Sequence, residues 1–215
     1  MFEPLSRIVK LLIEGIDALR KHKDRKDRTE AITQILEVYF LLKDCVDDAE
    51  KLLSECEWDP VGKIKSLPSE EAEKTVKQWD LIVRRQGLRL YLLQGHIYAD
   101  HRLSIIDPEL QKELTEVIGN KMNRAVTLHG IGSALYFYVA FPTAETPVEK
   151  ARYIQTMVGA EDKGPLNMEQ IISEIEKLRT ALDGYRSVVS QLVSNEELVA
   201  ISNIARERAL TAVRA

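Results

Sequence analysis

Residues 168–192 read MEQIISEIEKLRTALDGYRSVVSQL, and apolar side chains recur along this stretch at alternating steps of three and four. The positions that follow this spacing are Met168, Ile171, Ile175, Leu178, Leu182, Tyr185, Val189 and Leu192. Steps of three and four place all of these side chains on one face of an α-helix, whereas strands repeat every two residues. The stretch therefore predicts a long helix with one apolar seam.

The same spacing predicts further helices along the rest of the chain. Seams start near Val9, near Ile32 and after Pro68, and Asp107 with Pro108 begins a helix that continues to Phe141. The second of these seams runs through Ile32, Ile35, Tyr39, Leu42, Val46, Ala49 and Leu53. The third runs through Ala72, Val76, Trp79, Val83, Gln86, Leu90, Leu93 and Ile97, with Gln86 as its polar exception.

Two capping boxes predict where the last helices begin. Thr146 with Glu149, and Ser194 with Glu197, place a hydroxyl and a carboxylate three residues apart, a pairing that satisfies free N–H groups at a helix start. About seven helices result. Seams that repeat near 3.5 residues favour left-handed crossings of about 20°. We therefore expect an all-α fold, an elongated antiparallel bundle with shallow-angle packing.

The composition is that of one globular domain over residues 1–215. The chain is 45% hydrophobic and 30% charged with a net charge of -4, which argues against a protein that coats DNA. A possible sub-boundary lies at 159–166 and separates a C-terminal helical hairpin. Only two cysteines are present, Cys45 and Cys56, and no secretory signal precedes them, so we expect a cytoplasmic protein.

The segment 125–141 contains no formal charge, but polar and small residues such as His129, Gly130 and Ser133 interrupt it. It is also short for a transmembrane helix. We therefore expect no membrane contact and interpret this segment as the most buried helix of the bundle.

Motifs for common catalytic and cofactor sites are missing from the sequence. We find no phosphate loop, no Gly-x-Ser-x-Gly turn and no Glu-x-x-His pair, and expect no metal and no cofactor. Four carboxylates, Asp44, Asp47, Asp48 and Glu50, cluster off the seam of their helix. Because Lys51 follows Asp47 by four residues, they are interpreted as a solvated, partly paired face.

A basic run could bind nucleic-acid phosphates. Its six cations are Arg20, Lys21, Lys23, Arg25, Lys26 and Arg28. No aromatic residue lies between them to stack on a base. The favoured alternative is that Arg20 and Lys21 complement the carboxyl end of one helix dipole and Asp27 the amino end of the next.

Two Arg/His pairs, Arg89 with His96 and Arg124 with His129, have six and four residues between their members. Each pair resembles the short motif of the HEPN superfamily of all-α ribonucleases and nucleotide-binding domains. The resemblance implies a ribonuclease that needs no metal, binds RNA and brings two pairs into one cleft as a dimer. Alternatively, Arg89 and His96 are boundary residues that flank an apolar seam.

Two functions are therefore carried forward. The favoured one is a helical interaction or scaffold protein that self-associates or forms a subunit of a larger complex, through seams such as 168–192. Its partner would be a second copy or another protein. The alternative is the HEPN-like ribonuclease, and the sequence leaves open whether the chain is an enzyme.

Overall fold

The computed structural model describes residues 9–10, 13, 25–99, 146–158 and 168–214, and this part of the chain is helical without strands. Its helices are α2 (Arg25–Glu55), α3 (Pro60–Ser66), α4 (Ser69–Ala99), α8 (Pro147–Val158), α9 (Met168–Ser190) and α10 (Asn195–Arg214). The all-α prediction is confirmed for the described residues.

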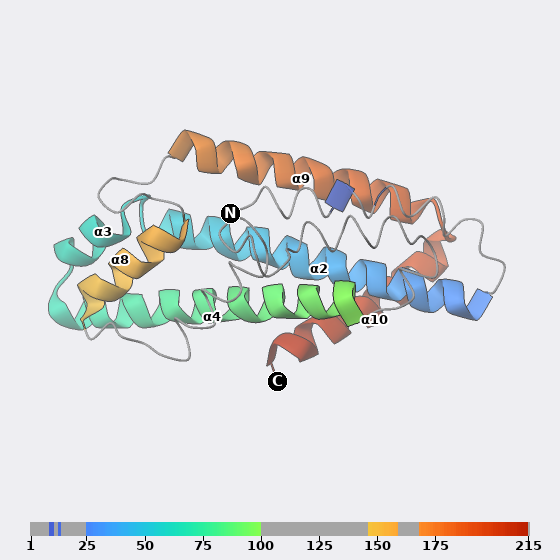
Figure 1. The fold of residues 1–215 in the computed structure, drawn as a ribbon, viewed down its shortest axis with the longest axis horizontal. Coiled ribbons are helices and arrows are strands. Elements are labelled where there is room, and N and C mark those ends of the chain that lie inside the picture. The colour runs from blue at the N-terminus through green and yellow to red at the C-terminus, as the bar shows by residue number, and fades with distance from the viewer. Residues whose placement is uncertain (1–8, 11–12, 14–24, 100–145, 159–167, 215) are drawn as a thin grey trace.

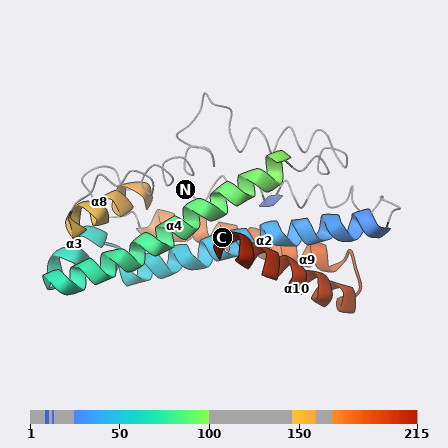
Figure 2. The same ribbon diagram turned by 90° about the horizontal axis from the view of Figure 1, so that it is seen from below.

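Helix α2 lies at the centre of the described part and contacts α4, α9 and α10 (Figure 1). Helices α4 and α9 run antiparallel to α2, as the colours of the two ends show, whereas α10 lies obliquely to it in both views (Figures 1 and 2). The short helices α3 and α8 pack against each other and against α4 at one end.

The central position of α2 follows from its sequence, which carries more than one apolar face. Six of the seven predicted seam residues are buried, and Ala49 is partly buried against the core. Further buried residues lie beside that seam: Ala31, Leu36, Val38, Leu41, Cys45 and Leu52. A helix that is apolar on several sides is stable only with neighbours on each of them. The segment 125–141, which we expected to be the most buried, lies outside the described residues.

The seam of α9 is buried against α2. All seven of its positions from Ile171 to Leu192 are buried, and the Tyr185 hydroxyl donates a hydrogen bond of 2.7 Å to the carbonyl oxygen of Ile35. The ring of Tyr185 stacks on that of Tyr39 at 6.0 Å between centroids. The side chains of this seam are therefore buried within the chain itself.

Both predicted capping boxes are confirmed. The backbone N–H and the hydroxyl of Thr146 each donate to the Glu149 carboxylate at 2.9 Å, and the N–H of Glu149 donates back to the Thr146 hydroxyl at 3.3 Å. Ser194 and Glu197 form the same three contacts at 3.3 Å. Helices α8 and α10 therefore begin where their side-chain pairs predict.

Helix α3 was not predicted, because seven residues are too few to show a seam. The Asp59 carboxylate caps it by accepting from the N–H of Gly62 at 2.9 Å, and Pro60 follows in the first turn. Asp59–Pro60 is the same start signal that the sequence shows at Asp107–Pro108.

The chain leaves α2 through two residues in the left-handed region, Glu57 at φ 52° and Trp58 at φ 62°. Their N–H groups donate to the carbonyl oxygens of Ser54 and Leu53, both at 3.2 Å, which is the Schellman pattern that closes a helix. Lys63 reaches back to the Glu57 carboxylate at 2.5 Å. This turn directs α3 and α4 back along α2.

None of the described helices combines the length and apolarity needed to cross a lipid bilayer.

Candidate functional site

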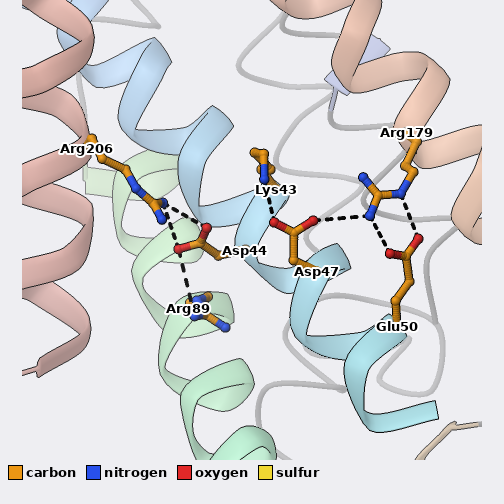
Figure 3. A network of polar contacts seen from close by, with 7 residues as sticks. All are labelled: Lys43, Asp44, Asp47, Glu50, Arg89, Arg179 and Arg206. Atoms are coloured by element: carbon orange, nitrogen blue, oxygen red, sulfur yellow. Dashed lines mark hydrogen bonds and ion pairs between the residues drawn. The ribbon is translucent and has the colours of Figure 1, made fainter. Parts of the chain in front are cut away.

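Carboxylates of α2 meet arginines from each of the three helices packed around it, and Figure 3 shows most of these contacts. They form two groups on different sides of the same turns of α2. The inner cluster consists of Asp44 and Asp48 of α2, Arg89 of α4 and Arg206 of α10. The outer cluster consists of Lys43, Asp47 and Glu50 of α2 and Arg179 of α9.

Three of the four side chains of the inner cluster are largely buried, whereas that of Arg206 is 37% exposed. Arg206 Nη1 lies 2.8 Å from both oxygens of Asp44, and Arg89 Nη1 lies 2.6 Å from Asp48 Oδ2 and Nη2 lies 3.8 Å from Asp44 Oδ2. The side chains of Arg89, Asp44 and Asp48 are 7%, 15% and 16% exposed. Asp44 therefore links three helices, because it faces both α4 and α10.

This burial corrects the interpretation of all four carboxylates as a solvated face. Asp44 and Asp48 lie off the α9-facing seam, as predicted, but α4 and α10 cover that side of α2. Asp47 and Glu50 are about 40% exposed and fit the prediction better.

The outer cluster joins α2 to α9. Arg179 Nε donates to Glu50 at 2.7 Å, and its Nη2 contacts both Glu50 and, at 3.2 Å, Asp47. The hydrogen bond to Glu50 is the main reason why the pKa of Arg179 is raised. Within α2, Asp47 pairs with Lys43 at 2.5 Å and not with Lys51, which lies 3.8 Å from Glu55.

Helix α10 is held by further polar contacts and by a seam of small side chains. Arg208 Nη1 lies 3.0 Å from Glu30 and 3.1 Å from Glu37, and the guanidinium of Arg206 lies over the Phe40 ring at 5.2 Å. The buried residues of α10 are Ile201, Ala205 and Ala209. Because two of these are alanines, α10 can approach α2 closely enough for the arginines to reach.

The predicted Arg/His pairs are only partly placed by the described residues. Arg89 belongs to the inner cluster, where its Nε has no hydrogen-bond partner among the described residues. His96 lies on α4, but its side chain is outside the described part, as are Arg124 and His129 altogether. No contact between the members of either pair is described.

The basic run falls at the start of α2. Arg25, Lys26 and Arg28 lie in its first turn, and Arg20, Lys21 and Lys23 lie outside the described residues. Asp27 is in the same turn, where a carboxylate complements the helix dipole as the alternative interpretation requires. The three cations there oppose the dipole, which that interpretation did not anticipate.

Neither cysteine has the properties of a nucleophile. Burial raises the pKa of Cys45 to about 12 and that of Cys56 to about 11, so both are neutral thiols near pH 7. Gln86, the polar exception on the α4 seam, donates to the carbonyl oxygen of Cys45 at 2.6 Å. Within the described ranges, no group of three or more His, Cys, Asp or Glu side chains could hold a metal ion.

Helix α4 also carries an apolar stripe that faces away from its buried seam, which we call the outer stripe: Leu81, Leu88, Tyr91 and Gly95. Leu81 is 58% exposed and Tyr91 is 69% exposed, and Leu88 is half-buried. A Cβ atom added to Gly95 would meet nothing within 4 Å. At about 100° per residue, the four positions span roughly 80° and lie opposite the buried side chains, and Arg84, which pairs with Asp80 at 2.8 Å, lies within the same span.

Sequence reasoning missed both the arginine partners and the outer stripe. The stripe has a signal in the sequence, since Leu81, Leu88 and Gly95 are seven residues apart. The outer stripe was not predicted, because the sequence pattern had been explained by one buried seam on α4. Arg179 and Arg206 had no local signal, because their partners lie more than 120 residues away.

Comparisons of the whole chain with known protein families, curated proteins and solved structures find no match.

Proposed function

We propose that this chain is an interaction protein, a helical subunit that assembles with a protein partner through the outer stripe of α4. The observation that carries the proposal is the position of this stripe. Its apolar side chains follow a heptad spacing on the side of α4 opposite the core, so α4 has more apolar surface than the described helices cover.

Single exposed apolar residues are common and need no explanation. The other exposed large apolar residues of the described part, such as Ile172 and Val199, lie on different helices from the outer stripe. In the outer stripe, by contrast, Leu81, Leu88 and Tyr91 share one face over three turns. This is the pattern with which one helix binds along another.

The proposed architecture around the stripe is a single elongated antiparallel bundle of about seven helices with shallow left-handed crossings. The opposite directions of α4 and α9 relative to α2 support it (Figure 1). The two cysteines are free and buried, which fits the reducing cytoplasmic setting that we propose.

The ribonuclease alternative has no comparable support. A catalytic Arg89 would have to bind a substrate phosphate, but its guanidinium is 7% exposed and already contacts Asp48 and Asp44. A phosphate would have to replace these carboxylates and would be repelled by them. We therefore place the interaction function first.

The test compares the wild type with a Leu81→Glu/Tyr91→Glu variant in lysate of the native cell. We expect wild-type protein to elute in an assembly larger than its own 24.5 kDa and the variant to elute as the single chain. Both changes replace exposed side chains, so the thermal melting temperature of the purified variant should match that of the wild type. Wild-type protein that elutes as a single chain in lysate would contradict the proposal.

A further inference from the structure

We infer that α10 is a salt-sensitive helix that opens away from α2 as a unit while α2, α4 and α9 stay packed. Ion pairs, more than apolar burial, hold it in the closed position, so rising ionic strength favours the open form. The residues that hold α10 on α2 are not those of the outer stripe, so this opening does not depend on the proposed function.

The first observation is how little apolar side chain α10 buries compared with α9. Helix α9, with 23 residues, buries six large apolar side chains. Helix α10, with 20 residues, buries only one, Ile201, beside Ala205 and Ala209, and Leu198 and Val213 are partly buried. Because burial of large apolar side chains contributes most to packing stability, separating α10 from α2 should cost much less than separating α9 from it.

The second observation is that two arginines attach α10 to carboxylates of α2. Arg206 Nη1 lies 2.8 Å from both oxygens of Asp44, and Arg208 Nη1 lies 3.0 Å from Glu30 and 3.1 Å from Glu37. The two arginine side chains are 37% and 47% exposed, so ions in solution have access to them. Salt therefore weakens the attraction that holds α10 closed.

Opening of α10 differs from a substitution that removes one partner of a buried pair. When the whole helix moves away, water reaches Asp44 and Glu37 as well as the arginines, so the solvation lost in the closed form is recovered. Asp44 also keeps Arg89, whose Nη2 lies 3.8 Å from its Oδ2. Departure of α9, by contrast, would expose six large apolar side chains to water with no such compensation.

The turn before α10 provides the point about which it opens. Leu192 is buried and fixes the chain just ahead of the turn, whereas the capping box of Ser194 and Glu197 stabilises the start of α10 without any group from α2. In the open form, α2 exposes a row of carboxylates at intervals of seven residues: Glu30, Glu37 and Asp44. Ionic strength thus controls whether this row is covered.

Hydrogen exchange of the full-length wild-type chain, followed by mass spectrometry of its peptides, tests the opening directly. At low salt the α10 peptides should exchange together and at least about tenfold faster than those of α9, because a helix that opens separately has its own opening equilibrium. In 1 M KCl, where the Debye length is about 3 Å, exchange of α10 should be about three to ten times faster again. Exchange of α9 should change far less.

A matched pair of double variants tests the role of the arginines. Arg206→Gln/Arg208→Gln should raise the exchange rate of α10 at least about tenfold at low salt and remove most of its salt dependence. Arg179→Gln/Arg186→Gln is the control, because it makes the same change in net charge at two exposed arginines of α9. It should leave α10 unchanged. Peptides of α2 and α4 should keep their wild-type protection in both variants, which verifies their folding.

Two results would overturn the inference. Wild-type α10 that exchanges at the rate of α9 at both salt concentrations would show that α10 does not open separately. Separate opening that responds neither to salt nor to Arg206→Gln/Arg208→Gln would show that apolar packing, and not charge, holds α10 in place. The salt series uses only the wild type, so it decides the first point even if a variant is poorly folded.

Discussion

The inner and outer clusters of α2 use the same types of side chain on two sides of the same helical turns, yet they differ in their surroundings. Asp44 and Asp48 lie under α4 and α10 and are about 15% exposed, whereas Asp47 and Glu50 lie at the edge of α9 and are about 40% exposed. The inner cluster links α2 to α4 through Arg89 and to α10 through Arg206, and the outer cluster links α2 to α9 through Arg179.

Burial decides how much such a link matters. An exposed pair attracts weakly because water and salt screen it, and breaking it leaves two solvated charges. A buried pair has already lost its water, so breaking it leaves a charge with neither solvent nor partner. The two clusters should therefore respond very differently to equivalent substitutions.

The largest effect should come from removing the arginine of the inner cluster. Arg89→Met keeps much of the side-chain volume but leaves Asp48 with only the more distant Arg85, at 3.8 Å, so we expect destabilisation near the lower end of about 3–5 kcal/mol. Urea unfolding followed by circular dichroism measures this loss. A loss below about 1 kcal/mol would mean that the inner cluster behaves like a surface pair.

A double variant shows whether the loss comes from the uncompensated charge. Arg89→Met with Asp48→Leu replaces the pair by apolar side chains, and Asp44 keeps Arg206 at 2.8 Å. Apolar replacement of a buried pair is often neutral, so the double variant should recover most of the stability. A double variant as unstable as Arg89→Met would point to lost packing.

The second-largest effect on stability should come from the Cys45 thiol. This residue follows Asp44 in the sequence and is buried in the same interior. Burial raises the pKa of Cys45 from 9.0 to about 12, an increase that the nearby Arg89 charge opposes, and burial raises that of Cys56 to about 11. The unfolded thiols lose protons above pH 9 while the folded ones keep them. Their contribution to stability is thus complete below pH 9 and is lost as pH rises towards 12 and 11.

In that window, each thiol should reduce the free energy of unfolding by about 1.4 kcal/mol per pH unit. The two thiols together should therefore reduce it by about 3 kcal/mol by pH 10. Urea unfolding of wild type and of Cys45→Ala at pH 8 and pH 10 tests this. The variant should lose about half as much as the wild type between these pH values. Equal losses would show that Cys45 is accessible to water in the folded chain.

The sequence predicted well those features that depend on neighbouring residues. The α9 seam is buried from Ile171 to Leu192, and the capping boxes at Thr146 and Ser194 start their helices. These features depend on contacts within one or two helical turns, which fixed spacings describe. The start of α3 at Asp59–Pro60 was of the same kind and could have been predicted.

The candidate site was predicted far less well, because its contacts depend on tertiary packing. Asp47 lies four residues from both Lys43 and Lys51, and spacing alone could not choose between them. The partner of Asp44 is Arg206, 162 residues away, and no local rule connects the two. The sequence pointed to Arg89 only through its spacing from His96. The described partners of Arg89 belong to another helix, α2.

A substitution at Tyr185 should have a smaller effect on stability, because the buried hydrogen bond that it makes between α9 and α2 involves no charged group. Tyr185→Phe removes the hydrogen bond to the Ile35 carbonyl and keeps the ring against Tyr39, so we expect a loss of about 1 kcal/mol. Tyr91→Phe is the matched control at an exposed position and should change stability by less than about 0.5 kcal/mol at low protein concentration. Equal effects of the two changes would contradict the buried hydrogen bond.

The smallest loss of stability should come from a substitution in the outer cluster, although its arginine makes the largest number of hydrogen bonds. Arg179 binds Glu50 through two nitrogens and also reaches Asp47, yet its side chain is 43% exposed. Arg179→Ala should therefore cost only about 0.2–1 kcal/mol, measured by the same urea unfolding. In 1 M salt the Debye length falls to about 3 Å, so the cost should shrink further, whereas that of Arg89→Met should not. A cost of Arg179→Ala that matches Arg89→Met and resists salt would show that the number of contacts, and not burial, sets the strength of these links.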